Sequence, residues 1–176
     1  MKNIATFLLI LLLSVSCGTA AYKSEESAAS AKTQTESGFS INLAKVDGGS
    51  FSFDEILGKK HLVAAFWATW CEPCKQELKK LAEIYPEFSD SVEFVAISTD
   101  TEEMIDKVNE FAVEAALPFP VLVDPSGNTV GTIIPGGDSV PYMVIVDMNG
   151  NIVSRHSGYN PGDETKLVEE LRELVR

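Results

Sequence analysis

The chain has 176 residues, of which 45% are hydrophobic and 23% are charged. This length and composition are typical of one globular domain with a short extension. The 26 acidic and 14 basic side chains give a formal net charge of −12, which argues against a surface that binds nucleic acid or anionic lipid through basic residues. The three cysteines are too few for a disulfide-stapled miniature protein, and their odd number leaves one without an intramolecular partner.

The first 16 residues have the pattern of a secretory signal peptide. Lys2 precedes an almost unbroken apolar stretch from residue 4 to residue 13, and about ten residues are too few to cross a bilayer core of roughly 30 Å as a helix. The small residue before Cys17 resembles the lipobox of bacterial lipoproteins. This resemblance implies that Cys17 is lipidated on sulfur and becomes the new amino terminus. The alternative is an ordinary cleaved signal that leaves a free cysteine.

Residues 17–37 are expected to form a flexible tether. Alanine, serine, threonine, lysine and glutamate dominate this segment, and Tyr22 is its only large apolar side chain. Such a composition cannot bury enough apolar surface to offset the entropy that ordering costs. The predicted organisation is therefore a signal over residues 1–16, a lipidated tether over 17–37 and a folded domain over 38–176.

The folded domain is predicted to alternate strands with helices. Alternating apolar residues around the Asp47-Gly48-Gly49 turn predict an opening β-hairpin over residues 39–53. Apolar runs of strand length and helical periodicities then follow one another. The predicted strands are 61–67, 92–97, 119–123, 142–146 and 152–155, and the predicted helices are 72–88, 102–116 and 164–175. This order implies an α/β domain whose mixed central sheet is covered on both sides.

The motif Cys71-Glu72-Pro73-Cys74 lies where the buried strand 61–67 passes into a helix. A thiol at a helix amino terminus has its thiolate stabilised by the helix dipole, so Cys71 is the candidate nucleophile. Cys74 lies nearly one turn further on, within disulfide distance, and can resolve a mixed disulfide. Pro73 suits the first helical turn. The charge of Glu72 partly opposes the dipole and favours a reducing pair.

Two other uses of these cysteines remain open at this point. A zinc site needs two further ligands, and the chain offers only His61 and His156 without a second cysteine pair. A purely structural disulfide across three residues closes so small a loop that it stabilises little. His61 itself is expected at the exposed start of a strand.

The motif Trp67-x-x-Trp70-Cys71-x-Pro73-Cys74 resembles the thioredoxin superfamily. Gly58-Lys59 before the apolar strand, the Glu-Pro dipeptide and the lipoprotein-like signal are similar to its TlpA/ResA branch of membrane-anchored thiol-disulfide oxidoreductases, which have a redoxin or AhpC-TSA-like domain. The resemblance implies a thioredoxin-like fold with an amino-terminal β-hairpin and a central α/β insert. It also implies an enzyme without a cofactor or metal.

The resemblance assigns roles to further residues. Glu77 occupies the place of a glutamate that assists proton transfer in this branch. It shares a helix face with Cys74, and a partly buried carboxyl with a raised pKa can accept the Cys74 proton. Val140-Pro141 matches the superfamily's cis-proline, which lets the Val140 backbone pair with a substrate segment. Trp70 is expected to lie over the reactive sulfur and to contact substrate.

The chain departs from the family at three places near these residues. Tyr142 follows the proline where threonine is usual, and a Gly-rich stretch, Pro135-Gly136-Gly137, precedes it. Both bear on substrate preference. Ala65 stands where thioredoxins proper carry a buried aspartate, which leaves Glu77 as the candidate proton acceptor.

Together these features predict an extracytoplasmic, lipid-anchored reductase of protein disulfides that receives electrons from an upstream membrane thiol-disulfide donor. The resemblance implies work in cytochrome c maturation or envelope disulfide homeostasis, with no nucleic-acid partner. The alternatives are a peroxiredoxin-like peroxidase and a non-enzymatic copper chaperone or binding module. A peroxidase needs a reactive cysteine with a nearby threonine and arginine, and the strand-to-helix cysteine pair does not show that pattern.

Overall fold

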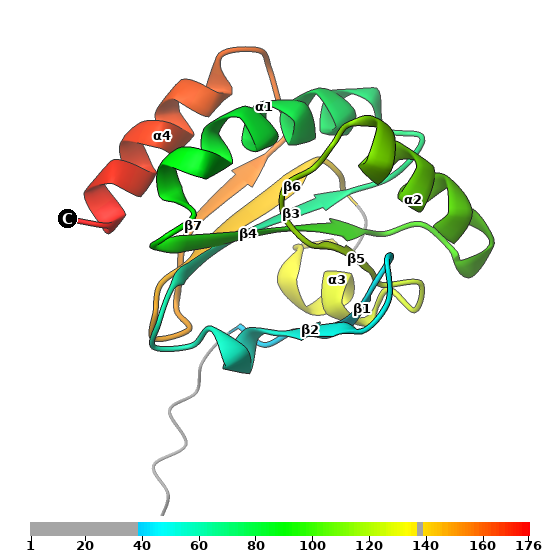
Figure 1. The fold of residues 1–176 in the computed structure, drawn as a ribbon, viewed down its shortest axis with the longest axis horizontal. Helices are drawn as coiled ribbons and strands as arrows, with labels where there is room; N and C mark the ends of the chain where they lie inside the picture. The colour runs from blue at the N-terminus through cyan, green and yellow to red at the C-terminus, as the bar shows by residue number, and fades with distance from the viewer. Residues whose placement is uncertain (1–38, 137–138) are drawn as a thin grey trace, which may run out of the picture. The chain divides into compact units, whose positions relative to one another are not determined.

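A mixed seven-stranded sheet forms the centre of the folded domain (Figure 1). The strands lie in the order β2-β1-β5-β4-β3-β6-β7, and β3 is parallel to β4 but antiparallel to β6. In chain order they are β1 (Asn42–Lys45), β2 (Ser50–Ser52), β3 (His61–Trp67), β4 (Val92–Ser98), β5 (Val121–Val123), β6 (Tyr142–Val146) and β7 (Ile152–Ser157). The helices are α1 (Glu72–Phe88), α2 (Ile105–Glu114), α3 (Asn128–Ile133) and α4 (Asp163–Leu174), with 3₁₀ turns at Phe53–Glu55 and Glu102–Met104.

This computed structural model describes residues 39–136 and 139–176, all within one unit that spans Glu36–Arg176. The predicted signal peptide, the Cys17 lipidation site and the tether lie outside the described residues. So do Gly137 and Asp138 of the Gly-rich stretch. No helix in the described ranges has the length and hydropathy needed to span a membrane.

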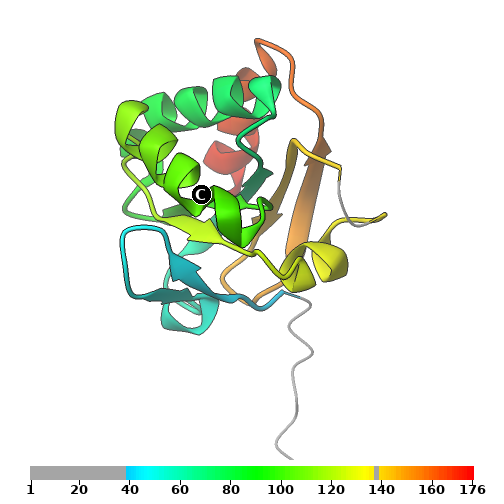
Figure 2. The same ribbon diagram turned by 90° about the vertical axis from the view of Figure 1, so that its right-hand side faces the viewer.

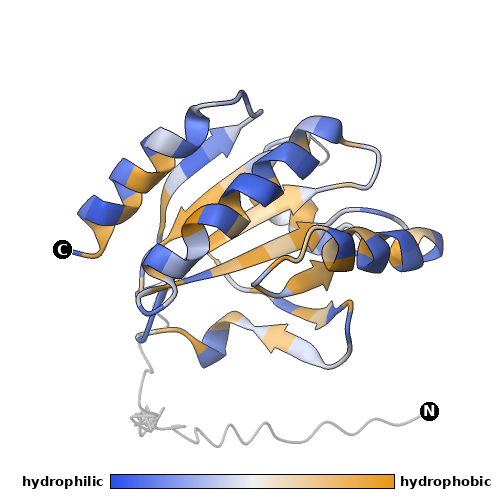
Figure 3. Ribbon diagram, turned by 45° about the horizontal axis from the view of Figure 1, so that its top comes forward, coloured by the Kyte–Doolittle hydropathy of each residue, from blue (hydrophilic) through white to orange (hydrophobic). Residues whose placement is uncertain are grey.

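Two hydrophobic cores lie on the two faces of the sheet. Successive side chains of β3 alternate between them, because neighbouring residues of a strand point to opposite faces. Val63, Ala65 and Trp67 pack under α1, α2 and α4, whereas Leu62, Ala64 and Phe66 pack toward α3 and the β1–β2 hairpin. Figures 1 and 2 show α3 on the opposite side of the sheet from the other three helices. In Figure 3 the inner strands are hydrophobic, while α1 and α4 carry hydrophilic residues as well. The predicted α/β fold with a covered mixed sheet is therefore confirmed.

The segment between β4 and β6 differs most from the elements predicted. Helix α2 ends at Glu114, two residues early, and Ala116 then takes a positive φ of 48°. Helix α3 was not predicted, because a six-residue stretch with an internal glycine has little helical propensity of its own. Buried Asp124 holds it instead, since its carboxylate accepts the backbone N–H groups of Thr129 and Val130 at 2.9 and 3.0 Å.

The expectation that His61 is exposed is wrong. Its side chain is 7% exposed, and its Nδ1 atom has no hydrogen-bond partner among the described residues. The reason is that β3 is covered on both faces from its first residue onward. Burial lowers the pKa of His61, because desolvation disfavours the charged imidazolium.

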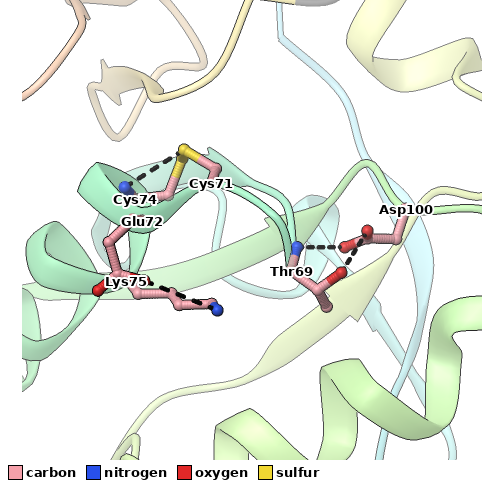
Figure 4. A network of polar contacts seen from close by, with 6 residues as sticks. All are labelled: Thr69, Cys71, Glu72, Cys74, Lys75 and Asp100. Atoms are coloured by element: carbon pink, nitrogen blue, oxygen red, sulfur yellow. Dashed lines mark hydrogen bonds and ion pairs between the residues drawn. A yellow bond between two sulfur atoms is a disulfide. The ribbon is translucent and has the colours of Figure 1, made fainter.

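A buried carboxylate fixes the loop that leads from β3 to the cysteines. Because β3 and β4 are parallel, their carboxyl ends meet at one edge of the sheet. Asp100, two residues beyond β4, accepts the backbone N–H and the hydroxyl of Thr69, each at 2.8 Å (Figure 4). It also accepts the Ser98 hydroxyl at 2.8 Å. Asp100 is only 6% exposed, so these bonds are shielded from water and hold the residue two positions before Cys71.

We expect Asp100→Ala to cost about 3 kcal/mol of unfolding free energy, because it leaves three donors without their charged acceptor. Asp100→Asn keeps one carbonyl oxygen and should cost less. Urea unfolding of the oxidised protein measures both values, with Asp90→Ala, at an exposed aspartate after α1, as the control. If both Asp100 variants unfold within about 0.5 kcal/mol of the wild type, the carboxylate does not hold the loop.

Candidate active site

Cys71 and Cys74 form a disulfide at the amino terminus of α1, with their Cα atoms 5.3 Å apart (Figure 4). Cys71 has extended backbone angles and is the N-cap residue of the helix, and its Sγ accepts the Cys74 backbone N–H at 3.3 Å. Cys71 is 4% exposed and Cys74 is fully buried. The outer sulfur is therefore the one that meets the positive end of the helix dipole, which favours its thiolate after reduction.

The residues beside the cysteines face solvent. Trp70 is 72% exposed, and Pro73 lies in the first turn of α1, where its missing N–H leaves no bond unmade. The Glu72 side chain is 71% exposed and lies 3.9 Å from Lys75, whose ammonium group is 5.9 Å from the centre of the Phe111 ring. Trp70 is thus free to contact a substrate that approaches Cys71.

Strand pairing brings Val140 and Pro141 to the same edge as the cysteines. Strand β6 begins at Tyr142, which pairs with Phe66 near the end of β3. The two residues before β6 therefore lie beside the β3–α1 junction. The Val140–Pro141 peptide bond is cis, which confirms the geometry that the motif predicted. Tyr142, which follows it, is buried in the core under α3.

Glu77 is the one carboxyl of α1 that is buried. It is 4% exposed and lies three residues after Cys74, so both side chains share a face of the helix. Desolvation raises the pKa of Glu77 to about 8, with a further contribution from the negative charge of Asp163. The predicted burial of Glu77 is confirmed, and the direction of its pKa shift agrees with the prediction. A carboxyl whose pKa is raised in this way can exchange protons at pH values where an ordinary glutamate is fully ionised.

Sequence reasoning missed two sets of residues around these cysteines. The first is Asp100 with Thr69, which fixes the approach to Cys71. The sequence did carry a signal for Asp100. It is a polar residue shortly after a buried strand, at the edge of the sheet where the cysteine motif also lies. The second is Tyr159 and Asp163, which lie near Glu77 although about 80 residues separate them in the chain. No local pattern could show this second contact.

The arrangement supports thiol-disulfide exchange. The Cys71 sulfur lies at a helix amino terminus, the Cys74 sulfur is bonded to it, and the Glu77 carboxyl, with a pKa of about 8, follows one turn later. Neither histidine is near the pair in sequence, although His156 of β7 pairs with Met143 of β6, which in turn pairs with Ala65 near the end of β3. His61 begins β3 at the far end from the motif, and His156 is held by Glu170 at 3.0 Å.

Comparisons with known proteins agree with this chemistry. A model of the AhpC/TSA family matches residues 35–155. The chain is 27% identical to the thiol-disulfide oxidoreductase ResA of Halalkalibacterium halodurans, over 96% of this chain and 92% of that protein. It is 34% identical to the thioredoxin-like protein YneN of Bacillus subtilis, over 67% of this chain and 68% of that protein.

A solved structure shares the fold. The crystal structure of a putative thiol:disulfide interchange protein DsbE from Chlorobium tepidum superposes with a TM-score of 0.71 at 22% identity, covering 79% of this chain and 95% of that one. The matched family model spans more than half of the chain, and the cysteine pair has the geometry that disulfide exchange requires. The chain therefore belongs to the AhpC/TSA family, and it is a thiol-disulfide oxidoreductase.

Proposed function

We propose that this oxidoreductase works as a reductase of protein disulfides, with Cys71 as nucleophile, Cys74 as resolving thiol and Glu77 as proton acceptor. The observation that carries the proposal is the burial of Glu77 on the Cys74 face of α1, which places its pKa at about 8. With a pKa of about 8, Glu77 is mostly protonated at neutral pH, and its ionised fraction takes the Cys74 proton and later returns it.

The reaction proceeds in two exchange steps. The Cys71 thiolate attacks one sulfur of the substrate disulfide, forms a mixed disulfide and displaces the first substrate thiolate. The Cys74 thiol then gives its proton to the Glu77 carboxylate. The resulting Cys74 thiolate attacks the Cys71 sulfur and releases the second substrate thiolate. The product is the Cys71–Cys74 disulfide, and two electrons from an upstream membrane thiol-disulfide donor restore the dithiol.

The surface around Cys71 supports a protein as the substrate. Trp70 offers an exposed aromatic face next to the nucleophile. Val140 and Pro141, at the start of β6, lie at the same edge, where a backbone segment can align beside them. The exposed carboxylate of Glu72 opposes the helix dipole, which makes the thiolate of Cys71 less favoured and the pair more reducing.

The proposed location is the extracytoplasmic face of a membrane, with the domain anchored through a lipid on Cys17. The apolar stretch before Cys17 and the small residue at position 16 support this location, as does the polar composition of residues 18–37. Cytochrome c maturation or the upkeep of envelope thiols is the proposed setting. The ResA relative supports an exchange reaction of this kind through its name as a thiol-disulfide oxidoreductase.

Cys74→Ser should trap substrates on Cys71, because the mixed disulfide forms but cannot be resolved. Non-reducing gels followed by mass spectrometry of cells that express the variant should show mixed disulfides at Cys71. Cys71→Ser is the matched control and should trap none. If the two variants give the same pattern, Cys71 is not the nucleophile.

Glu77→Gln should slow the resolution of a preformed mixed disulfide at neutral pH by about 100-fold, since the Cys74 proton loses its acceptor. The first attack by Cys71 should keep its rate. Stopped-flow measurement with a disulfide peptide separates the two steps, and Glu87→Gln, an exposed change on the same helix, serves as the control. Equal resolution rates in the wild type and Glu77→Gln across pH 6–9 would remove Glu77 from the mechanism.

The stability of the oxidised protein should decrease as the pH rises from about 4.5 to about 8. Folded Glu77 keeps its proton up to a pKa of about 8, whereas the unfolded chain releases it near the ordinary value of 4.5. The folded state therefore binds more protons in this window, and the unfolding free energy falls by at most about 1.4 kcal/mol per pH unit. The unfolding free energies of the wild type and of Glu77→Gln can be measured by urea titration at each pH. The difference between the two should show this slope. A flat difference would show that Glu77 ionises normally in the folded protein.

A further inference from the structure

One oxygen of the Glu77 carboxyl is left without a partner. Its Oε2 atom is buried and accepts or donates no hydrogen bond among the residues that the structure describes. Buried polar atoms are almost always paired, and where protein groups do not reach them an ordered water does. The carboxyl therefore requires a partner that comes from outside the protein groups around it.

A cavity of about 200 Å³ adjoins this carboxyl on the side of α4 (α1 and α4 lie side by side in Figure 1). It is enclosed by α1, by Met143 of β6, by the end of β7 with the loop that follows, and by the first turns of α4. Glu77 and Leu81 form its α1 wall together with Lys80, and neither cysteine is among its lining residues. The cavity thus reaches Glu77 from the side of β7 and α4, and the surface where a substrate meets Cys71 is not part of it.

The cavity lining is polar enough to hold water. Ser157 and Tyr159 contribute hydroxyl groups, and the Tyr159 hydroxyl donates to Glu164 at 3.1 Å. A space of this volume accommodates several waters, and its polar lining offers them hydrogen-bond partners. An empty cavity of this size is expected only where the walls are apolar.

Charged groups surround the carboxyl from three elements. The titratable and charged side chains that line the cavity are Lys80 from α1, His156 from β7, Tyr159 from the following loop, and Asp163, Glu164 and Lys166 from α4. Asp163 is held in place, since its Oδ2 accepts the Asn160 backbone N–H at 2.8 Å. Its negative charge favours the protonated form of Glu77. Lys80 and Lys166 are paired with Glu83 and Asp163 at 2.7 and 3.9 Å, so part of their positive charge is neutralised.

We propose that this cavity is the proton port of Glu77: water held between α1, β7 and α4 carries the proton between the Glu77 carboxyl and bulk solvent. The proposal rests on the role of Glu77 in the proposed function. During reduction of a substrate, the Cys74 thiol gives its proton to the Glu77 carboxylate on one side. Glu77 then gives a proton to cavity water on the other side, and the water passes it to solvent. When the disulfide is reduced again, protons enter by the reverse route.

The port predicts rapid solvent exchange of the Glu77 proton in the oxidised protein. The carbonyl stretch of protonated Glu77 can be isolated by infrared difference spectroscopy between the wild type and Glu77→Gln. On transfer to D₂O at pH 6, the wild-type band should shift within the mixing time. Ser157→Trp, which places a large side chain at the cavity, should slow the shift at least tenfold. Arg155→Trp, on the same strand but outside the lining, should not.

A second variant tests whether a charge of the cavity lining acts on the Glu77 carboxyl. Asp163→Asn keeps an oxygen that can accept from Asn160 but removes the charge, so the ionised fraction of Glu77 at pH 7 should rise at least twofold. Glu169→Gln, an exposed change on α4 outside the lining, should leave it unchanged. Carbon-detected NMR of the glutamate carboxyls measures this fraction in the full oxidised chain.

These outcomes separate the port from the proton-acceptor role. Equal exchange rates in Ser157→Trp and Arg155→Trp would overturn the port even if Glu77 remains essential for resolution. An ionised fraction that Asp163→Asn leaves unchanged would show that the charge of Asp163 does not act on Glu77. In a single turnover that starts from the dithiol at a pH above 8, where Glu77 is already ionised, Ser157→Trp should resolve the mixed disulfide at the wild-type rate, because that step then needs only the transfer from Cys74 to Glu77. If Glu77→Gln loses resolution and Ser157→Trp does not, the role of Glu77 as proton acceptor is supported. Whether the cavity is the proton port is then decided by the exchange measurement.

Discussion

The junction between β3 and α1 is the constraint on which the rest of this site depends. A fully buried strand ends at Trp67, and the helix begins five residues later at Glu72, with Cys71 as its N-cap. The short connection has little freedom, because the Asp100 carboxylate accepts hydrogen bonds from both the backbone N–H and the hydroxyl of Thr69. The sulfur of Cys71 is therefore held at a helix amino terminus in the oxidised state, where the unpaired N–H groups of the first turn are ready to stabilise a thiolate.

The helix that presents Cys71 also determines the chemistry of the inner sulfur. One turn into α1, the side that faces the sheet carries Cys74 and then Glu77, and both are shielded from solvent. A carboxyl in that position would be costly to keep ionised, so it holds a proton at neutral pH while the disulfide is closed. This is the state expected at the end of substrate reduction. In the proposed mechanism, the exposed side of this helical turn presents the nucleophile to the substrate, and its buried side holds the thiol and the carboxyl that exchange a proton.

Local sequence signals predicted the elements that carry the cysteines, but not the groups that tune them. The continuous apolar run 61–67 and the periodicity of 72–88 matched β3 and α1 to the residue, because each has a strong pattern and a clear boundary. Glu77 was assigned through its place in the family motif, and its position on the same helix face as Cys74 agreed with that assignment. By contrast, α3 depends on a capping carboxylate outside it, and the burial of His61 depends on the layers that cover β3. Asp163 and Tyr159 reach Glu77 only through the packing of α4, which no local pattern encodes.

The reduction potential of the Cys71–Cys74 pair tests the central claim that this oxidoreductase works as a reductant. Exposed Glu72 and buried Glu77 both place carboxyl groups around the sulfurs, and neither favours an unusually stable thiolate. Equilibration of the purified domain with a glutathione or dithiothreitol redox buffer should therefore give a potential near that of thioredoxin, about −270 mV. A potential near about −120 mV, the value of a strong oxidant such as DsbA, would contradict the account.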